Sequence, residues 1–143
     1  MNVVKCISGL RQEGKSTELL EDYLRVNKLY GINAVFIKCE QPSNSKHTGI
    51  TKLNEDIMKL DKLDSLSEIT FDKYKLVAVY NEQLLMDTIH SHVAEYDCVL
   101  FIDDPHVICT DFTTIVEKIV DETPNEECGN SVDITYTRLR NKQ

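Results

Sequence analysis

Two glycines, a lysine and two hydroxyl side chains lie close together in the segment GLRQEGKST, residues 9–17. The segment matches the pattern GxxxxGK[ST], with Gly9, Gly14, Lys15 and Ser16 at the fixed positions. Glycines permit positive φ and let backbone amides approach an oxygen closely. A lysine supplies charge-assisted hydrogen bonds, and a hydroxyl is a ligand that Mg²⁺ accepts. This combination predicts a loop that binds a polyphosphate, here ATP, together with Mg²⁺.

We expect the backbone amides of this loop to surround the phosphates, while the bulky side chains between the glycines point away. The helix that follows would present the positive end of its dipole to the anion. Lys15, an exposed loop lysine in this prediction, would reach the β- and γ-phosphate oxygens, and Ser16 would bind the metal. Arg11 is a candidate for stabilising γ-phosphate charge, and the alternative is an ordinary surface arginine. The predicted phosphate-binding residues are Gly9, Gln12, Glu13, Gly14, Lys15, Ser16 and Thr17.

A second candidate is the segment CVLFIDDPHV, residues 98–107, in which an apolar run ends in two acids. Asp103 is placed to hold the water shell of the Mg²⁺ ion opposite Ser16, and Asp104 to orient or deprotonate an attacking nucleophile. Two adjacent carboxylates also repel each other, which is a further reason to expect a cation. The alternative is a strand end followed by a turn or a helix cap, because Asp-Pro often begins a turn. His47 and His106 lie in predicted loops nearby and are further candidates for ligand contact.

The elements that would position these residues alternate along the chain. Apolar runs predict strands at 2–8, 33–39, 76–80, 98–104 and 131–139. Helical spacing predicts helices at 15–30, 81–96 and 111–121, with Asn81 and Asp111 as N-caps. Pro, Ser, Asn and Gly predict a loop at 41–51, and the charged stretch 52–75 predicts a helix and then a turn. The apolar face of the first helix is predicted to contain Leu19, Leu20, Tyr23, Leu24, Val26 and Leu29.

Strands that alternate with helices predict one α/β domain, with a mainly parallel sheet of about five strands and helices on both faces. The continuous apolar run VLFI at 99–102 is typical of a central strand that is buried on both sides. Ligands in such folds bind beyond the carboxyl ends of the strands. Both candidate segments directly follow a predicted strand, so we expect them at the same edge.

Composition narrows the possible partners of the 143-residue chain. Its formal net charge of −8 would repel nucleic acid, because no run of basic residues concentrates positive charge. The five cysteines form no CxxC motif, so we expect reduced and mostly buried thiols. No apolar run approaches the ~18 residues of a membrane span, and no cleavable leader is recognisable. We therefore expect a cytoplasmic protein without membrane contact that binds a nucleoside triphosphate. A protein or a second copy of the chain is a further candidate partner.

Three stretches of the sequence resemble the type II thymidine kinase family. They are SGLRQEGKSTELLEDYLRVNKLYGINAVFIKCEQ, SKHTGIT and YDCVLFIDDPHVI, which together span about residues 4–110. The resemblance implies a RecA-like fold with ATP phosphates at residues 9–17, Asp103 as the metal acid, and Asp104 in the position of the general-base glutamate. In contrast to that family, this sequence has no paired CxxC motifs for the zinc-binding, thymidine-enclosing segment. The Arg-Gln pair and the IDDPH motif also resemble the ATPase part of phage large terminases.

Three functional hypotheses follow from these patterns. The favoured one is a Mg·ATP-binding protein of thymidine-kinase-like fold that hydrolyses ATP or transfers phosphate to a small acceptor such as a nucleoside. The second is a motor-type ATPase module that acts in nucleic-acid processing. The third is a catalytically decayed nucleotide-binding protein that regulates a protein partner.

Overall fold

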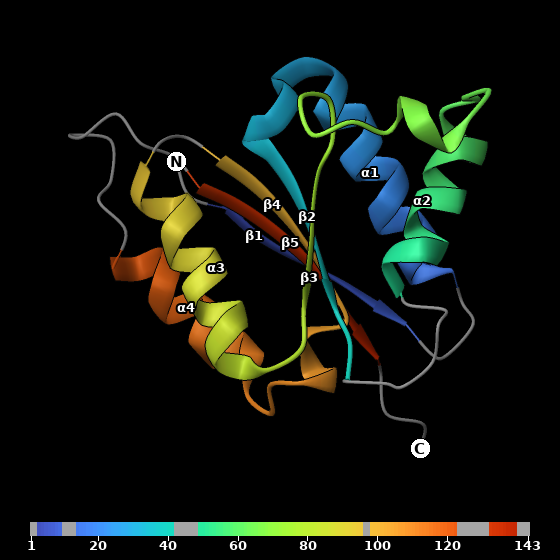
Figure 1. Ribbon diagram of the computed structural model, residues 1–143. Coiled ribbons are helices and arrows are strands. Elements are labelled where there is room, and N and C mark those ends of the chain that lie inside the picture. Colours follow the sequence, from blue (N-terminus) through green and yellow to red (C-terminus); the bar gives the residue numbers. More distant parts are fainter. Residues whose placement is uncertain (1–2, 10–13, 42–48, 96–97, 123–131, 140–143) are drawn as a thin grey trace.

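The computed structural model describes residues 3–9, 14–41, 49–95, 98–122 and 132–139 (Figure 1). Five strands form one sheet in the order β1-β5-β4-β2-β3, and every neighbouring pair is parallel. The strands are β1 (Val3–Gly9), β2 (Ala34–Cys39), β3 (Lys75–Val79), β4 (Cys98–Asp103) and β5 (Val132–Leu139). The predicted strands match these elements to within one residue at each end.

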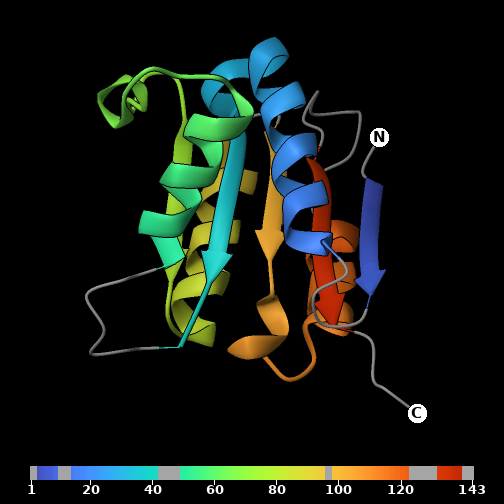
Figure 2. The same ribbon diagram turned by 90° about the vertical axis from the view of Figure 1, so that its right-hand side faces the viewer.

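Helices cover both faces of the sheet (Figures 1 and 2). They are α1 (Lys15–Tyr30), α2 (Gly49–Leu60), α3 (Glu82–Glu95) and α4 (Phe112–Glu122). In Figure 2, α1 and α2 lie in front of the sheet, and α3 and α4 lie behind it. The predicted three-layer α/β architecture with a parallel sheet is thereby confirmed, and it is consistent with a RecA-like fold.

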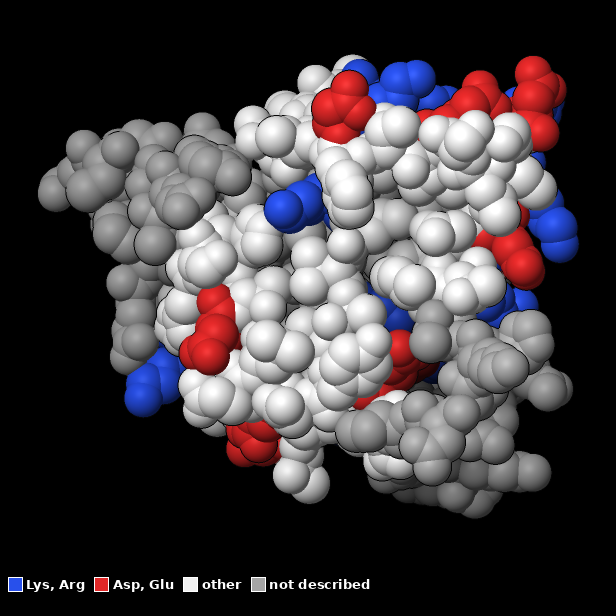
Figure 3. Space-filling view, viewed as in Figure 1, with Lys and Arg blue, Asp and Glu red and all other residues white. Residues whose placement is uncertain are grey.

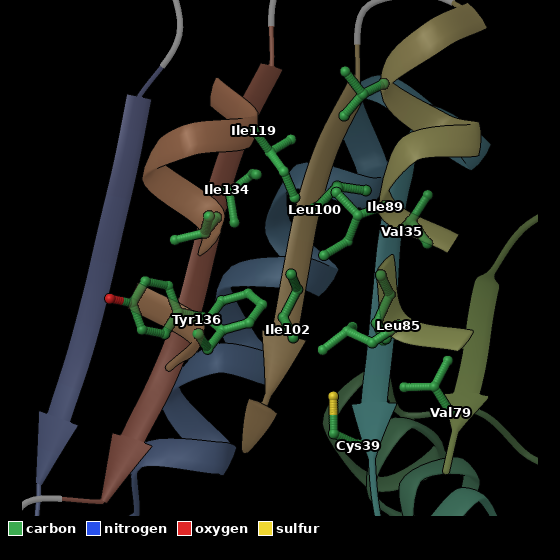
Figure 4. Close-up of a cluster of buried hydrophobic side chains, with 14 of the residues drawn as sticks. Val35, Cys39, Val79, Leu85, Ile89, Leu100, Ile102, Ile119, Ile134 and Tyr136 are labelled. Carbon is green, nitrogen blue, oxygen red and sulfur yellow. The ribbon is translucent and has the colours of Figure 1, made fainter. Parts of the chain in front are cut away.

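Each face of the sheet packs into its own apolar core. On the α3/α4 side, the inward side chains include Val35, Leu85, Ile89, Leu100, Ile102 and Ile134 (Figure 4). On the α1/α2 side, the core consists of Ile7, Leu19, Leu20, Tyr23, Leu24, Ala34, Phe36, Leu53, Ile57, Tyr74 and Phe101. Successive residues of one strand alternate between these cores, as the pleat of a strand requires. Strand β4 is the middle strand, which explains its unbroken apolar run.

The helix boundaries follow local signals. Helix α1 starts after Gly14, at φ 76°, and ends before Gly31, at φ 60°, whose N–H donates to the Asn27 carbonyl. Glycine accepts such positive φ values without steric cost. The side chain of Asn81 accepts a hydrogen bond from the Leu84 amide at 2.7 Å, so its predicted role as an N-cap of α3 is confirmed.

Two expectations about the α1/α2 side are wrong. Helix α2 begins at Gly49, inside the stretch that was predicted to be a loop, because its apolar residues Leu53 and Ile57 are buried against the sheet. Tertiary burial here outweighs the local turn composition. Leu29 is 76% exposed rather than part of the core, because its position along the helix places it on the opposite side of α1 from the buried Leu20 and Leu24.

Among the described residues, Cys6, Cys39, Cys98 and Cys109 are free thiols, and all but Cys6 are buried. None of the described helices combines the length and the hydrophobicity that crossing a lipid bilayer needs.

Candidate functional site

Three neighbouring strands bring polar side chains into one row at the carboxyl edge of the sheet. Lys38 of β2 pairs in register with Asp103 of β4. Ile102 pairs with Tyr136, so the next position along the strands puts Asp103 beside Thr137 of β5. Because side chains alternate along a strand, Lys38, Asp103 and Thr137 all point to the α1 side. The sequence folds this way because the residues before them fill the opposite core.

Asp103 is the centre of the row and is only 3% exposed. Its Oδ1 accepts hydrogen bonds from the hydroxyls of Ser16 and Thr137, both at 2.9 Å. Its Oδ2 accepts a hydrogen bond from Lys38 Nζ at 2.8 Å. Burying a carboxylate without partners would cost several kcal/mol, so these three donors are what keeps a charged group at this depth.

Asp104 has a backbone in the left-handed region, with φ 54° and ψ 51°. Its N–H donates to Thr137 Oγ1 at 2.8 Å, which holds this conformation in place. Asp104 occupies the N-cap position of a short 3₁₀ helix, Pro105–Val107, but its side chain makes no capping hydrogen bond. The carboxylate instead contacts Lys15 Nζ at 3.3 Å through Oδ1 and Lys38 Nζ at 3.6 Å through Oδ2. From the sequence, Asp104 was either a functional acid or part of a turn or helix cap. Its backbone is at a helix-cap position, whereas its side chain belongs to the charged site.

Two lysines balance the two carboxylates. The side chain of Lys38 is 22% exposed and that of Lys15 only 12%, so the expectation of an exposed Lys15 is wrong. Burial by itself would lower the pKa of Lys38, but the adjacent carboxylates of Asp103 and Asp104 outweigh it and raise that pKa above its ordinary value. We expected a metal ion to offset the repulsion between the acids. In the structure, the ammonium groups of Lys15 and Lys38 also offset the repulsion between the two carboxylates.

Sequence reasoning missed Lys38 and Thr137 as site residues. A lysine at the end of an otherwise apolar strand was the available signal for Lys38, because a charged residue in a buried strand needs a partner. Thr137 carried no comparable signal. Its importance depends on the register of β5 against β4, and on its complete burial.

The glycine-lysine-serine segment leads from β1 into α1. Gly9 is the last residue of β1 and pairs in register with Leu139, so of the two glycines only Gly14 has positive φ. Lys15 and Ser16 form the first turn of α1, with their side chains turned toward the ends of β4 and β5. Thr17 follows in an exposed position. The other predicted residues of this segment, Arg11, Gln12 and Glu13, lie outside the described residues, as does His47.

The oxygens of Ser16 and Asp103 suit a magnesium ion. Adjacent ligands of an octahedral Mg²⁺ with bonds of about 2.0–2.1 Å lie about 2.9 Å apart. Ser16 Oγ and Asp103 Oδ1 are separated by that distance, 2.9 Å. In the described part of the chain, no group of three or more His, Cys, Asp or Glu side chains is arranged to hold a metal. Mg²⁺ does not need one, because it usually takes one or two protein ligands and completes its shell with phosphates and water.

A cleft of about 350 Å³ opens beside this row, between α1 and α2. Ser16 and Asp103 line its inner end, so the cleft and the polar row share a boundary. The full lining is Ser16, Thr17, Leu20, Phe36, Lys38, Lys52, Leu53, Asp56, Lys59, Leu60 and Asp103.

His106 lies away from the row. Its ring packs against Phe112 and Tyr136, with centroid separations of 6.2 and 6.3 Å. Tyr136 belongs to the core on the α3/α4 side, whereas Thr137 next to it points to the α1 side. Burial lowers the pKa of His106, as does the positive charge of Arg138.

The arrangement joins a helix N-terminus, two ammonium groups, two hydroxyls and two carboxylates at one edge of the sheet. Such a set can hold an anion and a hard cation side by side. A scan against protein-family models finds no match to this chain, and a search of curated proteins finds none either.

Proposed function

We propose that the protein binds Mg·ATP at the start of α1 and uses it to hydrolyse ATP or to transfer phosphate to a small acceptor. The observation that carries this proposal is the contact between Ser16 Oγ and Asp103 Oδ1 at 2.9 Å. It joins the serine of a GxxxxGKS segment to an acid at the end of the central strand. A glycine turn with no ligand would not require a buried acid there.

The phosphate tail would lie against the first turn of α1. Backbone N–H groups and the positive helix end attract anions at such a terminus. Lys15 would donate to β- and γ-phosphate oxygens, with charge-assisted bonds of about 1.5–3 kcal/mol each. It would have to leave Asp104 to do so, and the phosphate offers it a more highly charged partner.

Ser16 and Asp103 would hold the magnesium ion, and the bound ion would neutralise charge on the phosphates. Lys38 and Thr137 act on Asp103 from the other side and fix its orientation. Thr137 also fixes the backbone of Asp104. Asp104 would then orient the attacking nucleophile next to the terminal phosphate.

A second candidate function is a nucleotide-binding regulatory protein without turnover. It is favoured by the two oxygens of Asp104, which each contact an ammonium group and so leave little room to accept a proton. A motor acting directly on nucleic acid has less support. Acidic and basic side chains are interspersed on the face in Figure 3, with no broad basic area among its described residues.

A cytoplasmic location belongs to the proposal. The four described cysteines are free thiols, which persist where the environment is reducing.

A melting experiment with and without Mg·ATP tests the proposal. At a hundredfold excess over Kd the ligand should add about 2.7 kcal/mol, which corresponds to about 5–10 °C at this chain length. Ser16→Ala should reduce the shift with Mg·ATP more than the shift with ATP in EDTA. The proposal fails if ATP, ADP and GTP all leave the melting temperature of the wild-type protein unchanged.

A further inference from the structure

The cleft between α1 and α2 has an apolar floor. Leu20, Phe36 and Leu53 line it and are almost completely buried, while Leu60 at its margin is 39% exposed. Its volume of about 350 Å³ falls at the lower end of the range of ~300–1,000 Å³ that small-molecule sites occupy. The cleft therefore has room for a ligand with a compact apolar body.

Two exposed lysines of α2 stand over this floor. Lys52 and Lys59 are seven positions apart, which places them on one face of the helix two turns from each other. Both line the cleft, and within the described part of the chain neither forms an ion pair with a carboxylate. Asp56 lies between them and is the only acid that α2 contributes to the lining.

At the inner end of the cleft the charges are balanced. Lys38 lines it and offsets Asp103, which its ammonium group contacts at 2.8 Å. The lysines of the cleft thus outnumber its acids, although the whole chain carries a net charge of −8. A locally positive pocket on an acidic protein selects for anions.

We propose that this cleft is the acceptor site, and that the acceptor is a phosphomonoester with an apolar body about the size of a nucleoside. Its apolar body would cover Leu20, Phe36 and Leu53. Its phosphate would lie at the inner end, next to the row of polar side chains, and the exposed lysines would attract it electrostatically. This inference rests on the proposed function, because Ser16 and Asp103 form the boundary between the cleft and the ATP site.

The charges on Asp104 favour this acceptor over an alcohol. When a hydroxyl attacks the γ-phosphorus, its proton must be accepted, and Asp104, the acid placed for this, still has the ammonium group of Lys38 at 3.6 Å from its Oδ2 after Lys15 has moved to the phosphates. A phosphomonoester dianion attacks through an oxygen that carries no proton. A bond forms between that oxygen and the γ-phosphorus, the bond from the γ-phosphorus to the bridging oxygen breaks, and ADP leaves with the electron pair. The products are ADP and a diphosphate ester, and no proton is transferred.

Calorimetric titration of the Mg·ADP-loaded protein tests the inference. The probes are thymidine, thymidine monophosphate, adenosine, adenosine monophosphate, phenyl phosphate and glycerol phosphate. We expect at least one nucleoside monophosphate to bind about tenfold or more tightly than its own nucleoside, because the lysines of the cleft attract the charge of the phosphate. Glycerol phosphate, which lacks an apolar body, should bind more weakly than phenyl phosphate.

The double variant Lys52→Glu/Lys59→Glu should weaken monophosphate binding by about tenfold or more, since it reverses two charges. Both side chains are exposed, so the fold should persist. Lys73→Glu is the matched control, since Lys73 is exposed and lies before the amino end of β3, outside the cleft lining.

Each result decides the inference in one direction. It is overturned if nucleosides bind as tightly as their monophosphates, if no phosphomonoester binds, or if the Lys52→Glu/Lys59→Glu variant binds like the wild type. If monophosphates bind but Mg·ATP does not change the melting temperature, the proposed function is overturned instead, and the cleft remains an anion-binding site.

Discussion

Ser16 and Asp103 are 87 positions apart in the chain, and their side-chain oxygens are 2.9 Å apart in the fold. The contact joins the first turn of α1 to the end of the central strand. Three more side chains, Lys15, Lys38 and Thr137, reach the same acids from α1, β2 and β5. The edge of the sheet is thus held by one connected polar network, and its members can be tested separately.

Lys38→Met should destabilise the protein strongly. The change leaves Asp103 buried without its cation, and breaking a buried pair costs about 3–5 kcal/mol. Adding Asp103→Asn should recover much of this loss, because the uncompensated charge disappears. Urea unfolding of the two single variants and the double variant measures the coupling. If the two losses simply add, the ion pair is not coupled in the way that the 2.8 Å contact implies.

Thr137→Val should lower the free energy of unfolding by about 1–3 kcal/mol, because Asp103 loses a donor and the Asp104 amide loses its acceptor. Thr137→Ser keeps the hydroxyl and should cost less. Chemical denaturation compares the two variants. A loss in the valine variant no larger than that in the serine variant would contradict the role of the two hydrogen bonds of the hydroxyl.

Asp104→Asn should slow ATP hydrolysis by about 10²-fold or more, the usual contribution of a positioned acid or base. It should not weaken Mg·ATP binding, because Lys15 loses a competing partner and becomes free for phosphate. Phosphate release reports the rate, and the melting shift reports binding. Unchanged hydrolysis would remove Asp104 from the chemistry. Under the acceptor-site proposal, transfer to a phosphomonoester should suffer less than hydrolysis, because no proton is removed.

His106 should make stability depend on pH. Its pKa is lowered in the folded state by burial, so the unfolded chain binds a proton more readily. Stability should therefore be highest above the unfolded pKa of about 6.5 and fall as the pH drops from there toward the folded pKa. In His106→Gln this decline should be smaller. Melting curves between about pH 5 and 8 measure it, and an identical pH profile in both proteins would contradict the assignment.

The sequence was most informative where local signals define an element. Helix α1 was predicted at its observed bounds because Gly14 and Gly31 delimit it, and Asn81 marked the start of α3. The apolar run of β4 predicted its central place in the sheet. Both candidate segments come to one edge because parallel strands end together.

The sequence was least informative where partners come from different strands. Lys38 and Thr137 meet Asp103 only through the register of β2, β4 and β5, which no local pattern specifies. The cleft was not predicted either, because it depends on how α2 packs beside α1, although the stretch 52–75 that contains Lys52 and Lys59 was expected to begin as a helix. Leu29 was assigned to the apolar face of α1, but it lies on the opposite side of the helix from the buried residues.

The strand register that places Lys38, Asp103 and Thr137 side by side is also more stable than a register shifted by one residue. If β4 shifted by one residue toward its amino end, Asp103 would take the place of Ile102 in the aliphatic layer, and a shift the other way would put Ile102 in the place of Asp103 at the rim. A sheet in the wrong register would bury an unpaired charge in the apolar core or expose an isoleucine, and it would be less stable than the correct sheet. The same three polar side chains that form the candidate site therefore also favour the correct pairing of the strands.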